Sequence, residues 1–478
     1  MKGARRLSAA DSWFLDLEGP TVHLHVTGVL LIDPAESPRR FDYEAFTALL
    51  AARMGRLDAL RERIVPVPGG IDHPVALDVG ADLDDHLERV VLPGAPGSRE
   101  ASAEFHRLLS EFVSTPLDRS RPLWAMLFVE GLPEGRVALV AKLHHALVDG
   151  VSGVGFMGDL LDLDRDAPPG EESSEPDRRA GGSGVDLPSR TDLLRDAVLD
   201  RALDPLRPIR AVSRTGASLW GAATAALSAR GEREDSAAPF AAPRTSMNGS
   251  LSGAREVAFT SIPLEEVKAL RRAHEVPLND VLLAAVSSAL RAHLQEHGGL
   301  PDRPLVAAVP VSVHDRSGAD SAESTNQVSN MFVNLPVHLA DPLERLAAVH
   351  RSALRAKAVQ GAMGPEMLGD LVDLFPPGLL AGATSAWVGS GIANRIPPVQ
   401  SLIVSNVPGP DFPLYMAGAE VVGLFPFGPL MEGSGLNVTA LSHNGRFDIG
   451  VIACPDLVPE VDRLVEGILG GFEELRGP

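Results

Sequence analysis

The spacing of apolar residues in the first third of the chain predicts both strands and helices. His23 to Ile32 reads as a strand, and the apolar runs Pro122 to Val129 and Arg136 to Leu143 predict a strand pair joined by a turn that contains Gly and Pro. Tyr43 to Met54 and Glu104 to Val113 instead carry apolar residues at helical spacing. We therefore expect this part of the chain to mix the two kinds of element.

The last part of the chain shows the same mixture without strict alternation, which favours an α/β fold in the broad sense (α+β). Helices are expected at Leu264 to Ala273, from Asn279-Asp280 to His297, and at Asp341 to Lys357. Further strands are expected at Glu256 to Ile262, Leu305 to Val313, Met331 to Val337, Leu402 to Val407 and Phe447 to Ala453.

The middle of the chain differs in composition. Residues 164–184 are rich in Asp, Glu, Pro, Gly and Ser, which is typical of a linker, whereas helical spacing returns between Thr191 and Ala229. A length of 478 residues exceeds one typical core. We therefore expect an N-terminal domain at 1–163, a linker with a helical segment at 164–247, and a C-terminal domain at 248–478.

Charge and cysteine content restrict the partners and the compartment. The formal net charge of −20 argues against nucleic acid and against a polybasic membrane anchor. Cys454 is the single cysteine, so no internal disulfide can form, which fits a reducing cytoplasm. We expect no signal peptide and no transmembrane helix, because the most apolar stretch, Leu371 to Ala393, contains Asp373 and two adjacent prolines.

The sequence His144-His145-Ala146-Leu147-Val148-Asp149-Gly150 follows the second strand of the predicted pair. Imidazole titrates near neutrality, so a histidine at this strand end can remove the proton of a hydroxyl that attacks a carbonyl. Three other interpretations stay open. Ser152 or Cys454 could act as a nucleophile, although neither lies in a recognisable pattern. His144, His145 and Asp149 could bind a metal, or the pair could be a buried structural feature.

These seven residues match the HHxxxDG signature of the condensation-domain and chloramphenicol-acetyltransferase-like superfamily. Further motifs resemble the bacterial wax ester synthase/diacylglycerol acyltransferases, in the same order along the chain. They are Leu7 to Phe14, His25 to Gly28, Asp82 to Leu87, Pro122-Leu123-Trp124, Asn279-Asp280, and Ser405 to Pro410.

The resemblance implies two chloramphenicol-acetyltransferase-like domains around a central tunnel. By the same resemblance His145 is the base, His144 and Asp149 support its geometry, and Gly150 lets a substrate pass close to the backbone. The substrates implied are acyl-CoA and either diacylglycerol or a fatty alcohol, with no cofactor and no metal.

Each accessory motif also has a structural interpretation. Asn279 or Asp280 is placed to cap the following helix, and Ser405-Asn406 could form only a turn after a strand, although all four are candidate substrate-binding residues. Pro122-Leu123-Trp124 is expected to pack in the core.

The activity expected is an acyl-CoA-dependent O-acyltransferase that makes triacylglycerol, wax esters or both, without a covalent intermediate. One alternative is a condensation-type enzyme that takes carrier-protein or polyketide substrates, and another is a non-catalytic lipid-binding relative. Because the substrates are insoluble, we expect peripheral contact with the inner membrane face or with lipid droplets. The candidate surface is Leu368 to Val388, for which a pair of buried helices is the alternative.

Overall fold

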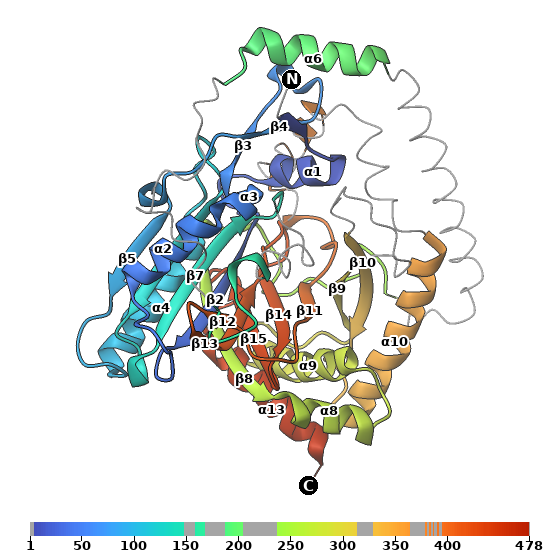
Figure 1. Cartoon of the computed structure of the whole chain (residues 1–478). Coiled ribbons are helices and arrows are strands. Elements are labelled where there is room, and N and C mark those ends of the chain that lie inside the picture. Colours follow the sequence, from blue (N-terminus) through green and yellow to red (C-terminus); the bar gives the residue numbers. More distant parts are fainter. Residues whose placement is uncertain are drawn as a thin grey trace.

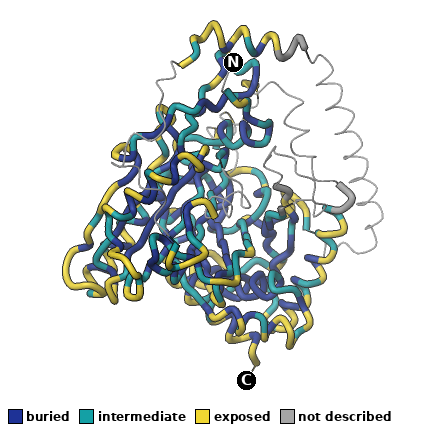
Figure 2. Tube along the Cα trace, viewed as in Figure 1, coloured by how far each residue is buried: buried dark blue, intermediate teal, exposed yellow. Residues whose placement is uncertain are grey.

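Two six-stranded sheets organise the molecule, and helices pack against both of them (Figure 1). The computed structural model describes residues 4–147, 158–167, 187–203, 237–312, 328–363, 378–379, 382–383, 386, 390–391 and 394–477. The buried residues follow the strands of both sheets, and the exposed ones lie on the outer helices and turns (Figure 2). Among these residues, no helix is both long and apolar enough to cross a lipid bilayer.

The first sheet has the strand order β12-β13-β2-β7-β6-β5. Its strands are β12 (Tyr415–Met416), β13 (Ala419–Phe427), β2 (His25–Asp33), β7 (Val137–His144), β6 (Trp124–Glu130) and β5 (Leu87–Val91). Alternate residues of β7 point to opposite faces, as in any strand. Leu139 and its neighbours on one face pack with helix α2 (Tyr43–Arg53), and Val140 on the other face packs with α4 (Arg99–Ser114).

Two strands of this first sheet come from the far end of the chain. Strand β13 pairs antiparallel with β2 along most of its length, from Glu420 opposite Asp33 to Phe427 opposite Thr27. A bulge between Val421 and Gly423 interrupts the register. The first sheet therefore combines residues of the N-terminal and C-terminal parts of the chain.

The second sheet has the order β10-β9-β11-β14-β15-β8. Its strands are β10 (Val328–Leu335), β9 (Leu305–Ser312), β11 (Leu402–Pro408), β14 (Leu436–His443), β15 (Arg446–Ala453) and β8 (Glu256–Pro263). Its outer face packs on α8 (Leu264–Ala273), α9 (Leu278–His297), α10 (Pro342–Met363) and α13 (Val461–Arg476). Helices α9 and α13 approach closely at Gly471, where an added Cβ would lie 2.6 Å from the carbonyl oxygen of Ala285.

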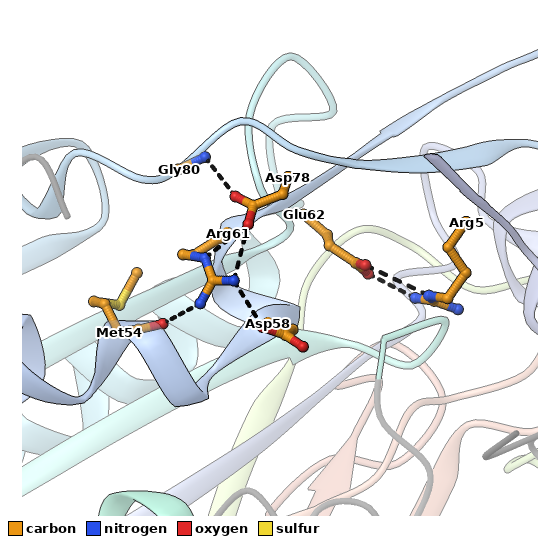
Figure 3. A network of polar contacts seen from close by, with 7 residues as sticks. All are labelled: Arg5, Met54, Asp58, Arg61, Glu62, Asp78 and Gly80. Atoms are coloured by element: carbon orange, nitrogen blue, oxygen red, sulfur yellow. Dashed lines mark hydrogen bonds and ion pairs between the residues drawn. The ribbon is translucent and has the colours of Figure 1, made fainter. Parts of the chain in front are cut away.

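A small third sheet, ordered β1-β4-β3, lies beside the N-terminus. It consists of β1 (Ala4–Arg6), β4 (Val75–Asp78) and β3 (Glu62–Val65), with α3 (Asp58–Arg61) leading into β3. Arg5 pairs with Glu62, and Arg61 pairs with Asp78 and Asp58 and donates to the carbonyl oxygen of Met54 (Figure 3). These contacts fix the chain directly ahead of helix α1 (Ala9–Leu17).

Helix α6 (Arg190–Leu203) packs on the same small sheet, with Leu193 buried against Val75 and Leu77. The ion pair between Arg6 and Asp196, 3.0 Å apart, joins it to β1. The remainder of the predicted linker, 168–186 and 204–236, lies outside the described residues. Most of the predicted membrane surface, Leu368 to Val388, also lies outside the described residues. Leu379 within it is described and is 62% exposed.

The expected strands and helices of both halves are present, with ends that differ by a few residues. Asp341 caps the start of α10, where it accepts the backbone N–H groups of Leu343 and Glu344. The predicted cap of α9 is wrong. That helix begins at Leu278, and its N-cap is Pro277, which offers no side-chain acceptor.

Candidate functional site

The histidine pair lies where β7 leaves the first sheet. All eight residues of β7 are buried, and its last residue, His144, stands opposite His25 at the start of β2. The chain then turns sharply, because the N–H of Leu147 donates to the carbonyl oxygen of His144 at 2.9 Å. The N–H of His145 donates to Leu24 at 2.8 Å. The N–H of His144 donates to the carbonyl oxygen of Leu123 at 3.0 Å, so backbone hydrogen bonds to the residues just before β2 and β6 fix the pair.

His144 is fully buried, and protein groups face both of its ring nitrogens. Nδ1 accepts the N–H of Ala146 at 3.1 Å, which requires an unprotonated Nδ1 and places the ring proton on Nε2. Nε2 faces the carboxylate of Glu18, with Oε2 3.7 Å away. His144 therefore holds the turn and does not offer a nitrogen to a substrate.

Glu18 follows the last residue of α1, and Arg119 anchors its carboxylate. The Arg119 guanidinium donates to Oε2 at 2.8 Å through Nε and at 2.5 Å through Nη2, and Nη2 also donates to the carbonyl oxygen of Leu15. Burial raises the pKa of Glu18, but His144 and Arg119 outweigh burial and lower that pKa to about 2. A fixed negative charge therefore lies behind the imidazole of His144.

His145 has a different environment. Its side chain is partly exposed, and its ring stacks on Phe14 of α1 with the centroids 4.1 Å apart and the planes 21° apart. Phe14 itself packs against the apolar cluster of Leu7, Leu15, Ile64, Leu123 and Ala146. Of the two histidines, His145 is the more exposed, although its Nδ1 is buried.

A buried lysine and a third histidine support the strand end from behind. Lys142 of β7 donates from Nζ to the carbonyl oxygens of Phe112 and Thr115, at 2.7 and 2.6 Å, and Nε2 of His25 lies 3.0 Å from the carbonyl oxygen of Val113. These carbonyls end helix α4, where cationic donors are favoured. Burial lowers the pKa of Lys142 to about 7.

The other residues of the signature, Asp149 and Gly150, lie outside the described residues, as does Ser152. The chain is described again from residue 158, and Arg53 of α2 holds it there. Arg53 pairs with Asp162 at 2.5 Å and also donates to the carbonyl oxygen of Leu160. Asp162 in turn bridges to Tyr415 of β12. Strands and α2 thus fix the chain on both sides of residues 148–157.

The expectation that Pro122-Leu123-Trp124 packs in the core is confirmed. Trp124 is 1% exposed, donates from Nε1 to the carbonyl oxygen of Leu60 at 2.8 Å, and stacks on His86 at 4.3 Å. Nδ1 of His86 lies 2.9 Å from the carbonyl oxygen of Trp124. Both residues therefore stabilise the first sheet.

Asn279 and Asp280 lie in the first turn of α9. Asp280 is 3% exposed, and its Oδ2 lies 2.7 Å from Nδ1 of His350 on α10. Burial raises the pKa of Asp280, and His350 partly opposes this effect. The carboxylate thus joins two helices behind the second sheet.

Ser405 and Asn406 belong to β11 itself, so the interpretation of these two residues as a turn is wrong. They pair in parallel with Thr439 and Ala440 of β14. The strand continues to Pro408, and the turn begins at Gly409. A Cβ at Gly409 would lie 2.4 Å from the carbonyl oxygen of Ser442, so the turn depends on glycine. Within the described part of the chain, no group of three or more His, Cys, Asp or Glu side chains is arranged to hold a metal ion.

Sequence reasoning assigned no role to four residues that hold the histidine pair or its strand in place, either directly or, for Arg119, through Glu18. Phe14 is part of a motif that carries the resemblance, whereas Glu18, Arg119 and Lys142 lie in no motif that we singled out. Two signals in the sequence could have pointed to these residues. Phe14 and Glu18 are four positions apart, and Lys142 is a charged residue within an otherwise apolar strand.

Comparison with known proteins identifies two family models along the chain. Residues 7–282 match the wax ester synthase/diacylglycerol acyltransferase catalytic domain, and residues 324–476 match the C-terminal domain of the same family. A protein of Mycobacterium tuberculosis strain CDC 1551, provisionally named a diacylglycerol O-acyltransferase, is 36% identical over 98% of this chain and 90% of its own. A probable diacylglycerol O-acyltransferase of the same strain is 32% identical, over 97% of each chain.

Solved structures agree with this result. The wax ester synthase/diacylglycerol acyltransferase from Marinobacter aquaeolei superposes with a TM-score of 0.66 at 26% identity, over 98% of both chains. The first condensation domain of the calcium-dependent antibiotic synthetase superposes with a TM-score of 0.57 over 99% of this chain and 96% of its own. Its 16% identity indicates a shared fold only.

Proposed function

The chain belongs to the wax ester synthase/diacylglycerol acyltransferase family, and from that premise we propose that it is an acyl-CoA-dependent O-acyltransferase. Its products are triacylglycerol from diacylglycerol, wax esters from long-chain alcohols, or both. The names of its relatives and the Marinobacter structure support this activity.

The observation that carries the mechanism is the different environment of the two imidazoles. The nitrogens of His144 face Ala146 and Glu18, whereas His145 is partly exposed and its ring is held by stacking on Phe14. His145 takes the proton of the acceptor hydroxyl as the oxygen attacks the thioester carbonyl. The tetrahedral oxyanion then collapses, the C–S bond breaks, and the proton passes from the imidazolium to the sulfur of CoA. Ester and free CoA leave without a covalent enzyme intermediate.

The remaining residues of the proposed site have supporting roles. Asp149 orients the loop that carries His145, and Gly150 allows the substrate to approach the backbone. Asn279, Ser405 and Asn406 are proposed to contact the substrates from the second half of the chain, whereas Asp280, expected to do the same, is proposed to hold α9 to α10 through His350. The insoluble substrates favour peripheral association of a cytoplasmic enzyme with the inner membrane face or with a lipid droplet.

The test is product analysis with purified protein, palmitoyl-CoA, and either diacylglycerol or hexadecanol. His145→Ala is expected to lower turnover by about 10²–10⁴, the range that general bases contribute. His106→Ala, at an exposed position on α4, serves as the matched control and keeps wild-type turnover. Wild-type turnover in folded His145→Ala would refute the mechanism. Replacing palmitoyl-CoA with palmitoyl-carrier protein separates this activity from that of a condensation-type enzyme.

A further inference from the structure

Helix α1 and its C-cap residue contact the two histidines of the signature. Phe14 stacks on His145 at 4.1 Å, and Glu18, four residues later, faces His144 at 3.7 Å. Residues four apart lie on the same side of a helix, so one short element supports the pair. The two contacts act on different histidines and can therefore be tested separately.

We propose that Phe14 is the positioning residue of the catalytic base. Its ring fixes the plane of the His145 imidazole, and its π face stabilises the imidazolium ion that forms when the alcohol loses its proton. This inference rests on the proposed function, because it requires that His145 carries positive charge during the reaction.

The first support is the way that α1 is held. Ser8 caps its N-terminus by accepting the N–H of Asp11 at 3.1 Å, and Arg119 binds the Leu15 carbonyl oxygen and Glu18 at its other end. Strand β1, three residues before the helix, belongs to the small sheet that the pair of Arg5 with Glu62 ties together (Figure 3). A ring on a helix fixed at both ends is a rigid platform.

The second support is the geometry of the contact. A stacked ring covers one face of the imidazole and leaves its edge, which carries both nitrogens, in a different direction. Because the two ring planes are only 21° apart, the nitrogens of His145 point along the face of Phe14 and not into it. Phe14 therefore constrains the base without competing for the nitrogen that receives the proton, which a hydroxyl or carboxylate at the same position would do.

The third support is electrostatic. The face of a phenyl ring carries partial negative charge and attracts a cation more strongly than a neutral group. The imidazole is neutral before the proton transfer and cationic during it, so the stacking strengthens as the reaction proceeds. An interaction that strengthens in the transition state raises kcat and leaves the KM for the substrates almost unchanged.

The experiment compares Phe14→Leu and Phe14→Trp with the wild type under the same product assay. Phe14→Leu keeps the apolar contact and removes the π face, and we expect kcat to fall by about 2- to 30-fold at unchanged KM. Phe14→Trp restores most of kcat. Phe240→Leu, which removes an exposed aromatic ring elsewhere in the chain, is the matched control and is expected to keep wild-type kcat.

A double-mutant cycle distinguishes this role from general support of the fold. In the His145→Ala background, Phe14→Leu is expected to cause no further loss of the residual activity, because its effect acts through the imidazole. The inference fails if Phe14→Leu lowers the residual activity by the same factor as in the wild type. It also fails if Phe14→Leu keeps full kcat, raises KM alone, or is not rescued by tryptophan. If His145→Ala itself keeps wild-type turnover, the proposed function fails instead.

Discussion

Replacing Glu18 with glutamine is expected to lower the free energy of unfolding at neutral pH, and to lower it less as the pH becomes acidic. Glu18 is almost fully buried between Arg119 and His144, and these two partners outweigh burial to hold its pKa at about 2 in the folded protein. The unfolded chain binds the same proton with a pKa near 4.5. Glutamine keeps the shape of the side chain but cannot carry the charge.

The magnitude follows from the gap between these two pKa values. At about 1.36 kcal/mol for each pH unit, the gap corresponds to roughly 3 kcal/mol of folding free energy. Because the folded pKa is the lower one, this contribution is complete above pH 4.5. It decreases as the pH falls from 4.5 towards 2, where both states become protonated.

The assay is urea unfolding of the wild type and Glu18→Gln at several pH values between 7 and 3.5. The difference between their free energies of unfolding is expected to be about 3 kcal/mol at pH 7 and to narrow below pH 4.5. Glu111→Gln removes the carboxylate of an exposed ion pair with Arg107 and is expected to leave stability near wild type at each pH. A difference for Glu18→Gln that stays constant between pH 7 and 3.5 would refute the reasoning.

Three further predictions concern the packed interior. His443 is 1% exposed, and neither ring nitrogen has a hydrogen-bond partner among the described residues. Burial, aided by Arg446, lowers its pKa to about 4 from 6.5, so wild-type stability falls as the pH drops through that window. Unfolding at pH 7 and pH 4.5 should show that His443→Leu removes up to roughly 3 kcal/mol of this fall, and an unchanged slope would contradict it. In α13, a Cβ at Gly470 meets no atom within 4 Å, so Gly470→Ala should stabilise the protein by about 1 kcal/mol. A Cβ at Gly471 meets the backbone of Ala285, so Gly471→Ala should destabilise the protein by about 1–3 kcal/mol. Equal melting temperatures of the two variants would contradict this prediction. Trp124→Ala should cost about 3–5 kcal/mol in thermal or urea unfolding, and a loss below 1 kcal/mol would show that the ring is not a core residue.

The sequence predicted the local elements because their signals are local. Strand β7 is a continuous apolar run that ends at the histidine pair, and α8 has apolar residues at helical spacing over its whole length. The HHxxxDG signature could be recognised for the same reason, since all its residues lie within seven positions.

Contacts between distant segments could not be predicted in this way. Glu18 and Arg119 are 101 positions apart, and the strand that completes the first sheet beside β2 begins at Ala419. Periodicity within a window carries no information about such pairings. The error at α9 has a related cause. Aspartate is a residue type that commonly caps helices, but the carboxylate of Asp280 binds His350 on another helix. Pro277 takes the N-cap position of α9 instead.

The pairing of β13 with β2 has a consequence for synthesis of the protein. When β2 has just been translated, its partner strand is still nearly four hundred residues away, which takes roughly 20–80 s at bacterial speeds. During that interval the nascent chain carries an open hydrogen-bonding edge flanked by apolar side chains. A truncated product that stops before Ala419 should therefore aggregate or recruit chaperones, and a separately expressed C-terminal fragment should restore it to solution by supplying the missing strand.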